Sequence, residues 1–184
     1  KGEIGSNCIA ITPELVLEFK SIWSRLVVTT HNPNFALPFF HMRSEPFWKL
    51  VTHNGMSIPI TSSHSIRSFN ALRESIAFAE LDAATFALMQ DPIQLTVMEE
   101  ALLEQYFPET KNRFYSREAD LFSELETEIL HDTPLIYRNR IKELQKELSK
   151  EDFAETVFVR KGAFKREIPK IYNYQCAISE MRIE

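Results

Sequence analysis

The most distinctive segment of the chain reads His31-Asn32-Pro33-Asn34-Phe35-Ala36-Leu37-Pro38-Phe39-Phe40-His41-Met42-Arg43. It places rigid apolar groups, namely prolines, an alanine and phenylalanines, beside histidine and arginine donors. Such a mixture suits a ligand in which an apolar or soft atom is attached to an anion. The same aromatic residues would equally suit a loop packed on the core, because buried phenylalanine is usually part of a core. On the residues alone, both interpretations stay open.

Helical patterns lie on both sides of this segment. Thr12-Pro13-Glu14 is typical of a helix start, and apolar residues follow at helical spacing to about residue 28. Further helices are predicted over 65–79, 82–89, 91–107, 112–131, 135–150 and 160–172. In the helix over 91–107, the residues expected to face inward are Leu95, Met98, Leu102 and Tyr106.

The only β element predicted before the C-terminal segment is a hairpin. Its strands are expected over 47–51 and 57–60, with Asn54-Gly55 at the turn. The predicted fold class is therefore mainly α: a compact multi-helix domain with a small β-hairpin, followed by a helical linker.

The composition excludes several classes of protein. With 184 residues, of which 44% are apolar and 26% charged, the chain is long enough for one domain with its own core. The four glycines cannot form a G-x-G-x-x-G motif or a P-loop. No apolar run approaches the ~20 residues of a membrane span. The two cysteines, Cys8 and Cys176, cannot supply a four-cysteine zinc site.

The net charge of −5 is unevenly distributed. Residues 31–73 carry four Lys/Arg and one Glu, whereas residues 74–159 carry eight basic and nineteen acidic groups. Residues 160–184 are again net basic, with six Lys/Arg and three Glu. A polyanion would be repelled by the acidic part and held by 31–73 or by the C-terminal segment. The simpler interpretation of 74–159 is an ordinary solvated acidic surface.

Two further patterns concern phosphate binding and catalysis. Ser62-Ser63-His64-Ser65-x-Arg67 precedes a predicted helix, where hydroxyls, free N–H groups and an arginine can hold a phosphate. Helix capping by serine is the structural alternative. The histidines at 31, 41, 53 and 64 match no metal-ligand motif, and carboxylates are nearly absent around them. We therefore predict no catalytic residue and no metal ligand within residues 1–184.

Residues 31–50, His-Asn-Pro-Asn-Phe-Ala-Leu-Pro-Phe-Phe-His-Met-Arg-Ser-Glu-Pro-Phe-Trp-Lys-Leu, resemble the sulfur-binding domain of phosphorothioation-dependent restriction endonucleases. Residues 65–74, Ser-Ile-Arg-Ser-Phe-Asn-Ala-Leu-Arg-Glu, are similar to it as well, and the resemblance spans roughly 9–110. Residues 164–177 look like the segment that leads into the HNH nuclease domain of these enzymes. The resemblance implies a sulfur-binding-like DNA-recognition domain over 1–110, a charged helical linker over 111–159 and the start of an HNH domain over 160–184.

The resemblance also implies a ligand and the residues that bind it. In this family a sulfur replaces a non-bridging phosphate oxygen of DNA and enters a shallow apolar pocket, whose pattern matches Asn32, Pro33 and Ala36. Neighbouring phosphates or base edges would be held by polar residues nearby. The full set of DNA- and sulfur-binding residues implied here is His31, Asn32, Pro33, Ala36, His41, Arg43, Ser63, His64 and Arg67.

Expectations about the parent protein follow from the same resemblance. The chain starts at Lys1 without a signal peptide and stops soon after an aromatic segment, so we expect a piece of a longer cytoplasmic enzyme of a restriction system. The catalytic His-Asn-His set of the HNH nuclease, a hydrolase, would follow Glu184. A divalent metal is expected only there, and no cofactor within residues 1–184.

The expected partner is double-stranded DNA carrying phosphorothioate groups, with no membrane. Homodimerisation is left open by the sequence. The alternative function, from a different class, is an α-helical protein-interaction adaptor that does not bind DNA. In that case the acidic helices over 112–150 would dock a partner. Steep weakening of binding by salt would distinguish DNA recognition from this alternative.

Overall fold

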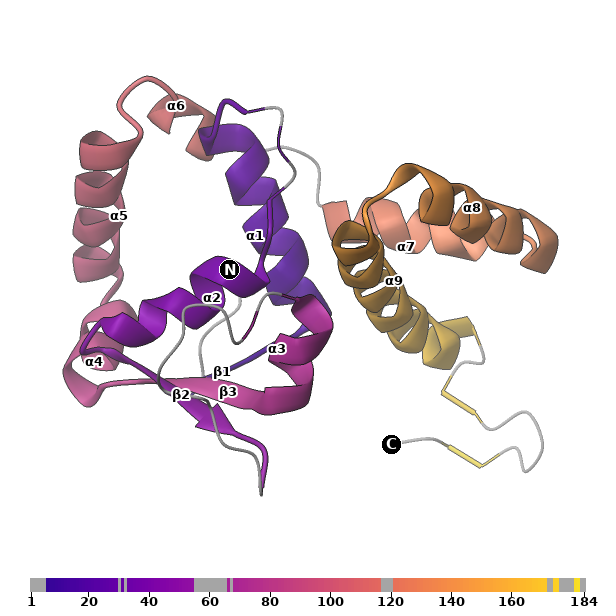
Figure 1. The fold of residues 1–184 in the computed structure, drawn as a ribbon, viewed down its shortest axis with the longest axis horizontal. Coiled ribbons are helices and arrows are strands. Elements are labelled where there is room, and N and C mark those ends of the chain that lie inside the picture. Colours follow the sequence, from indigo (N-terminus) through magenta and orange to yellow (C-terminus); the bar gives the residue numbers. More distant parts are fainter. Residues whose placement is uncertain are drawn as a thin grey trace. The chain divides into compact units, whose positions relative to one another are not determined.

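The computed structural model describes residues 6–29, 31, 33–54, 66, 68–116, 121–171, 174–175 and 181–182. The chain divides into two compact units, shown in Figure 1. Unit 1 comprises residues 1–11 and 19–117, and unit 2 comprises residues 12–18 and 118–184. The described residues are mainly helical with a small three-stranded antiparallel sheet, which confirms the predicted fold class.

The sheet belongs to unit 1 and has the strand order β1-β3-β2. Its strands are β1 (Cys8–Ala10), β2 (Trp48–Thr52) and β3 (Ile76–Leu81). The central strand β3 pairs antiparallel with both neighbours, so that Ala79 lies opposite Ile9 of β1 and Leu50 of β2. The predicted strand over 47–51 is confirmed as β2. The predicted second hairpin strand, 57–60, lies outside the described residues.

The helix predicted over 65–79 is wrong over its last four residues, 76–79. Within that range the structure has α3 (Phe69–Ser75), and the chain then continues directly as β3. Ile76 follows Leu72 by four residues, so its apolar spacing suits a helix as well as a strand. Pairing with two neighbouring strands decides the outcome, because β-structure depends on such context more than on local preference. The short strand β1 was not predicted at all.

The starts of three helices agree with the capping residues in the sequence. The hydroxyl of Thr12 accepts the N–H of Leu15 at 3.1 Å, and the carboxylates of Asp82 and Asp91 each accept two N–H groups of the helices that follow them. The remaining helices of unit 1, with the 3₁₀ turn η1, are α1 (Pro13–Leu26, whose residues up to Glu18 belong to unit 2), α2 (Ala36–His41), η1 (Met42–Ser44), α4 (Ala83–Gln90), α5 (Pro92–Tyr106) and α6 (Lys111–Phe114).

The predicted inward face of α5 is wrong at two positions. Leu102 and Tyr106 are 55% and 62% exposed, whereas Leu103 is buried. The apolar residues of this helix lie on both of its sides, since Ile93 and Val97 are also exposed. Apolar spacing therefore does not define a single inward face here.

The aromatic residues of the segment 31–50 form much of the core of unit 1. The ring of Phe35 lies 5.5 Å from Phe19, 5.3 Å from Phe39 and 6.2 Å from Phe69, centroid to centroid. Phe39 packs edge-on against Trp48, whose indole N–H donates to the carbonyl of Phe39 at 3.1 Å. The interpretation of these aromatics as core residues is therefore confirmed.

Unit 2 consists of three described helices together with the start of α1. They are α7 (Leu121–His131), α8 (Pro134–Glu147) and α9 (Lys150–Ile171). The predicted helix over 112–131 corresponds to α6 and α7, and residues 117–120 between them lie outside the described part. The predicted helix over 160–172 begins ten residues earlier, at Lys150, so α9 continues across the predicted domain limit at 159/160.

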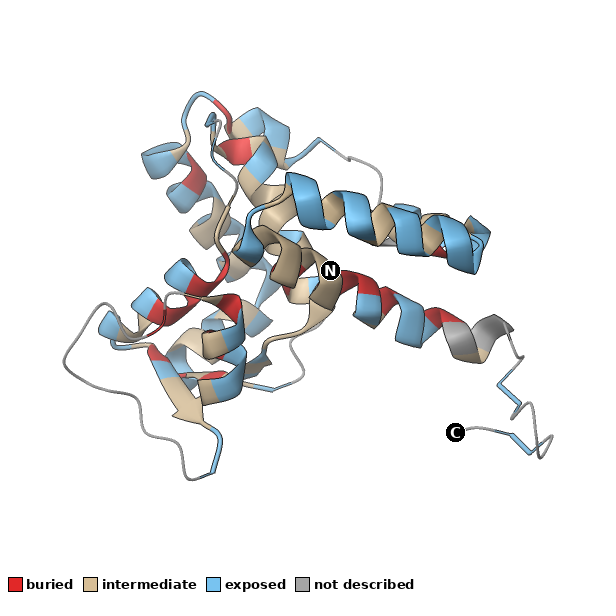
Figure 2. Cartoon of the chain, turned by 45° about the vertical axis from the view of Figure 1, so that its right-hand side comes forward, coloured by how far each residue is buried: buried red, intermediate tan, exposed pale blue. Residues whose placement is uncertain are grey.

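Burial in unit 2 is concentrated on α9. Buried residues recur along this helix in Figure 2, whereas α8 is largely exposed and has no buried residue. In the described part of the chain, no helix is both long and apolar enough to cross a membrane.

Candidate functional site

The candidate site is built around α2 in unit 1. Phe39 and Phe40 of α2 point into the core, whereas Leu37 and Pro38 are exposed. Before the helix, the Asn34 side-chain oxygen accepts the N–H of Leu37 at 3.1 Å and fixes the turn that carries the half-buried Pro33. The segment is thus anchored on its core side and accessible on the other.

The two apolar residues of the implied sulfur pocket differ in how far they are exposed. Pro33 is half-buried, whereas Ala36 has no exposed surface. A sulfur atom could touch the Ala36 methyl group only if the atoms that cover it were displaced. Of the two residues, only Pro33 is partly exposed.

Arg43 lies just beyond the other end of α2. Its guanidinium carbon sits 4.0 Å from the centre of the Phe40 ring, a distance typical of a cation–π contact. The side chain is half-buried and forms no ion pair with any described carboxylate, including the nearby Glu45. The ring holds the cation in place without neutralising it, so its charge is available to an anion.

An open cleft of about 590 Å³ adjoins Arg43. Ser44 and Lys49 also line it, as do Trp48 and the acidic Glu45. The Lys49 ammonium lies 3.6 Å from Glu80 and is mostly exposed, so this pair is weak. Two cations and a hydroxyl at the wall of one cleft can bind an anion such as a phosphate, although Glu45 lowers the net charge there.

His31 and His41 are exposed at the two ends of the same segment. The backbone N–H of His31 donates to the Thr29 hydroxyl at 3.1 Å, and the ring of His41 contacts Phe40 with centroids 5.7 Å apart. His53 lies elsewhere, with its Nε2 atom 3.1 Å from the carbonyl oxygen of Arg73. Within the described ranges, no three His, Cys, Asp or Glu side chains are close enough together to hold a metal ion.

Nine residues were expected to contact DNA or sulfur, and five of them are described. His31, Pro33, Ala36, His41 and Arg43 lie on or beside α2. The other four expected residues lie outside the described part of the chain: Asn32, Ser63, His64 and Arg67.

Three polar residues beside α2 or in the cleft next to Arg43 were not expected from the sequence: Asn34, Ser44 and Lys49. Asn34 could have been found as a capping residue, because asparagine near a helix start commonly accepts an N–H group three positions further along the chain. Lys49 could have been found from the alternation along β2, where it follows the buried Trp48 and therefore faces solvent. Ser44 carries no comparable signal.

The chain was also compared with models of protein families, with curated proteins and with solved structures, and none of these comparisons finds a match.

Proposed function

We propose that unit 1 binds double-stranded DNA that carries a phosphorothioate group in its backbone. The proposal rests on the resemblance of residues 31–50 to a sulfur-binding domain. The observation that supports it best is the pairing of a partly exposed proline, Pro33, with an arginine that has no ion pair to a described residue, Arg43, at the two ends of one anchored helix. Such a segment offers an apolar contact and a cationic contact to the same ligand.

The apolar contact would favour sulfur over oxygen. Sulfur is larger and more polarisable than oxygen, so a proline ring gains more dispersion energy from it. An ordinary phosphate oxygen in the same place would lose water without gaining a donor, at a cost of about 1–3 kcal/mol. That penalty corresponds to a roughly 5- to 160-fold preference for the modified backbone. Specificity thus includes a penalty on the unmodified ligand.

The cationic contact would hold a neighbouring phosphate. An α-helix rises about 1.5 Å per residue, so the five steps from Ala36 to His41 span roughly 7–8 Å along its axis. Phosphates of one DNA strand follow each other every ~3.4 Å of the duplex axis. A strand whose sulfur lies at Pro33 and that follows α2 would therefore place a nearby phosphate at the end of α2 that carries His41 and Arg43.

The experiment compares two duplexes of one sequence, one normal and one with a single phosphorothioate linkage, by fluorescence anisotropy with the full chain. We expect tighter binding of the modified duplex and a steep fall of both affinities with salt. Equal affinities would contradict the sulfur contact. If neither duplex binds, DNA recognition itself is wrong, which is the result that the adaptor alternative predicts.

A further inference from the structure

Unit 2 contains a groove that plays no part in the proposed DNA site. It has a volume of about 610 Å³, and residues of α7, α8 and α9 line it. Its floor is apolar and includes Ile129, Tyr137, Ile141 and Phe164. Phe164 is 47% exposed. A large apolar side chain exposed within an apolar groove is typical of a surface that a partner covers.

Cations stand along both sides of this floor. Arg138 and Lys142 lie one turn apart on α8, and Lys161 and Lys165 lie one turn apart on α9. All four are exposed, and none forms a hydrogen bond or ion pair with a described residue. The groove is therefore an apolar strip between two short rows of unneutralised positive charge.

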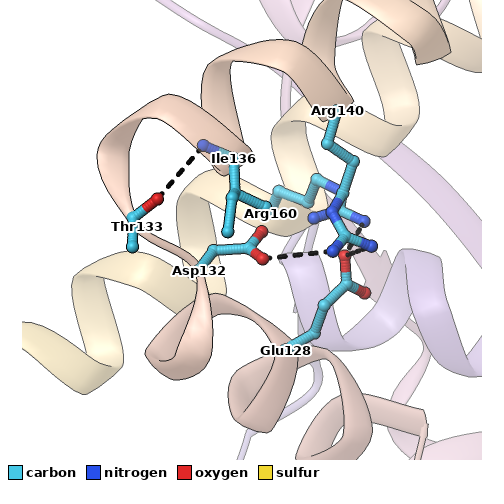
Figure 3. A network of polar contacts seen from close by, with 6 residues as sticks. All are labelled: Glu128, Asp132, Thr133, Ile136, Arg140 and Arg160. Atoms are coloured by element: carbon cyan, nitrogen blue, oxygen red, sulfur yellow. Dashed lines mark hydrogen bonds and ion pairs between the residues drawn. The ribbon is translucent and has the colours of Figure 1, made fainter.

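Other cations of the same helices are neutralised inside unit 2, as Figure 3 shows. Glu128 pairs with Arg140 at 2.6 Å and with Arg160 at 2.9 Å, and Asp132 pairs with Arg140 at 3.1 Å. Asp132 is the single carboxylate among the groove-lining residues, and its side chain is only 7% exposed. The two arginines of this network are thus paired, while the four cations beside the groove are left for an external partner.

We propose that this groove binds an acidic amphipathic helix of a partner protein. A helix with apolar residues at positions i, i+4 and i+7 covers an apolar strip, and glutamates on its flanks meet cations on both sides. The proposal rests on this complementarity of charge and polarity, and it is independent of the proposed DNA binding.

Two other anionic ligands fit the groove less well. A nucleic-acid backbone would place hydrated phosphates against apolar side chains, which costs free energy because no donors there replace the lost water. A fatty acid would cover the floor, but its single carboxylate could neutralise only one or two of the four cations. An acidic helix alone satisfies both the floor and the two rows.

The test uses the full chain and a synthetic peptide of about four helical turns, with leucines along one face and glutamates on both flanks. A peptide of the same composition in scrambled order is the control. Fluorescence anisotropy should give a dissociation constant of about 1–100 μM for the amphipathic peptide. The scrambled peptide should bind at least tenfold more weakly, because it has no continuous apolar face.

Charge-reversal variants locate the binding. The double variant Lys161→Glu/Lys165→Glu should weaken peptide binding at least tenfold. The matched control, Lys146→Glu/Lys150→Glu, reverses two exposed lysines outside the groove lining, near the end of α8 and at the start of α9, and should leave binding within about twofold of wild type. Likewise Phe164→Ala should weaken binding, whereas Leu135→Ala, at a residue that is 65% exposed and outside the lining, should not.

Three results would overturn the proposal. The first is no binding of the amphipathic peptide at about 1 mM. The second is equal loss of affinity in the groove variant and in its matched control. The third is a duplex DNA or a fatty acid that binds wild type, loses its affinity in Lys161→Glu/Lys165→Glu and is not displaced by the peptide.

Discussion

Arg43 holds its charge over the Phe40 ring, and no carboxylate in the described ranges pairs with it. If Arg43 contacts a phosphate, Arg43→Ala should weaken normal and modified DNA by a similar factor and lower the salt slope of log K by about one. The ratio of the two affinities should stay unchanged. Arg113→Ala, which removes an exposed cation of α6, is the control. A salt slope identical to that of wild type would remove Arg43 from the DNA surface.

Pro33 should determine the sulfur preference rather than the overall affinity. Pro33→Ala removes most of the proline ring, so the affinity for modified DNA should fall toward that for normal DNA. Pro38→Ala changes an exposed proline of α2 and should leave the ratio of affinities intact. The ratio is measured by anisotropy on both duplexes at one salt concentration. A ratio that survives Pro33→Ala would contradict the assignment of the pocket.

Gly162 of α9 packs against Pro13 in unit 2, where an added Cβ would overlap the proline ring. Alanine is favoured over glycine in a helix by about 1 kcal/mol, but overpacking costs about 1–3 kcal/mol. Gly162→Ala should therefore lower the free energy of unfolding, as measured by urea denaturation. With Pro13→Gly, which removes the overlapping ring, the double variant should lose less than the sum of the two. A rise in stability for Gly162→Ala alone would show that the contact is absent.

At the scale of elements, the start of α4 responds to pH through Asp82. Hydrogen bonds from Thr85 and from the backbone N–H of Ala84 hold the pKa of this carboxyl below its ordinary value of 3.8. A lowered pKa in the folded state stabilises the fold above about pH 3.8, and this contribution is lost as pH falls through the folded pKa. Asp82→Asn keeps an acceptor but does not titrate, so its stability should fall less between about pH 4 and pH 2. Parallel pH profiles for the two proteins would contradict this role.

The elements also show what local sequence can predict. The starts of α1, α4 and α5 were predictable, because Thr12, Asp82 and Asp91 each cap the helix that follows. The strand β3 was not, because its apolar spacing continues that of α3 and its identity depends on two distant strands. Capping is a local interaction, whereas strand pairing joins residues far apart in the chain.

At the scale of the whole molecule, the sequence singled out the segment around α2 but did not show which of its residues would be exposed. The aromatic residues near α2 were recognisable, but their periodicity did not reveal that Ala36 would be buried while Pro33 is only half-buried. The groove of unit 2 was not predictable, because it depends on how three helices pack. Its cation pairs, Arg138 with Lys142 and Lys161 with Lys165, are a local signal that helical spacing alone could have provided.

The most direct test of DNA recognition by unit 1 uses the stereochemistry of the modified phosphate. Sulfur can replace either of two non-bridging oxygens, which gives two diastereomeric duplexes of one sequence. A contact on one side of the strand, such as the Pro33 ring, reaches only one of these positions. Binding of the full chain to the normal duplex and to each diastereomer should therefore show one diastereomer bound tightest, by roughly 5-fold or more over the other two. Equal affinity for all three duplexes would contradict the proposed recognition of phosphorothioate DNA.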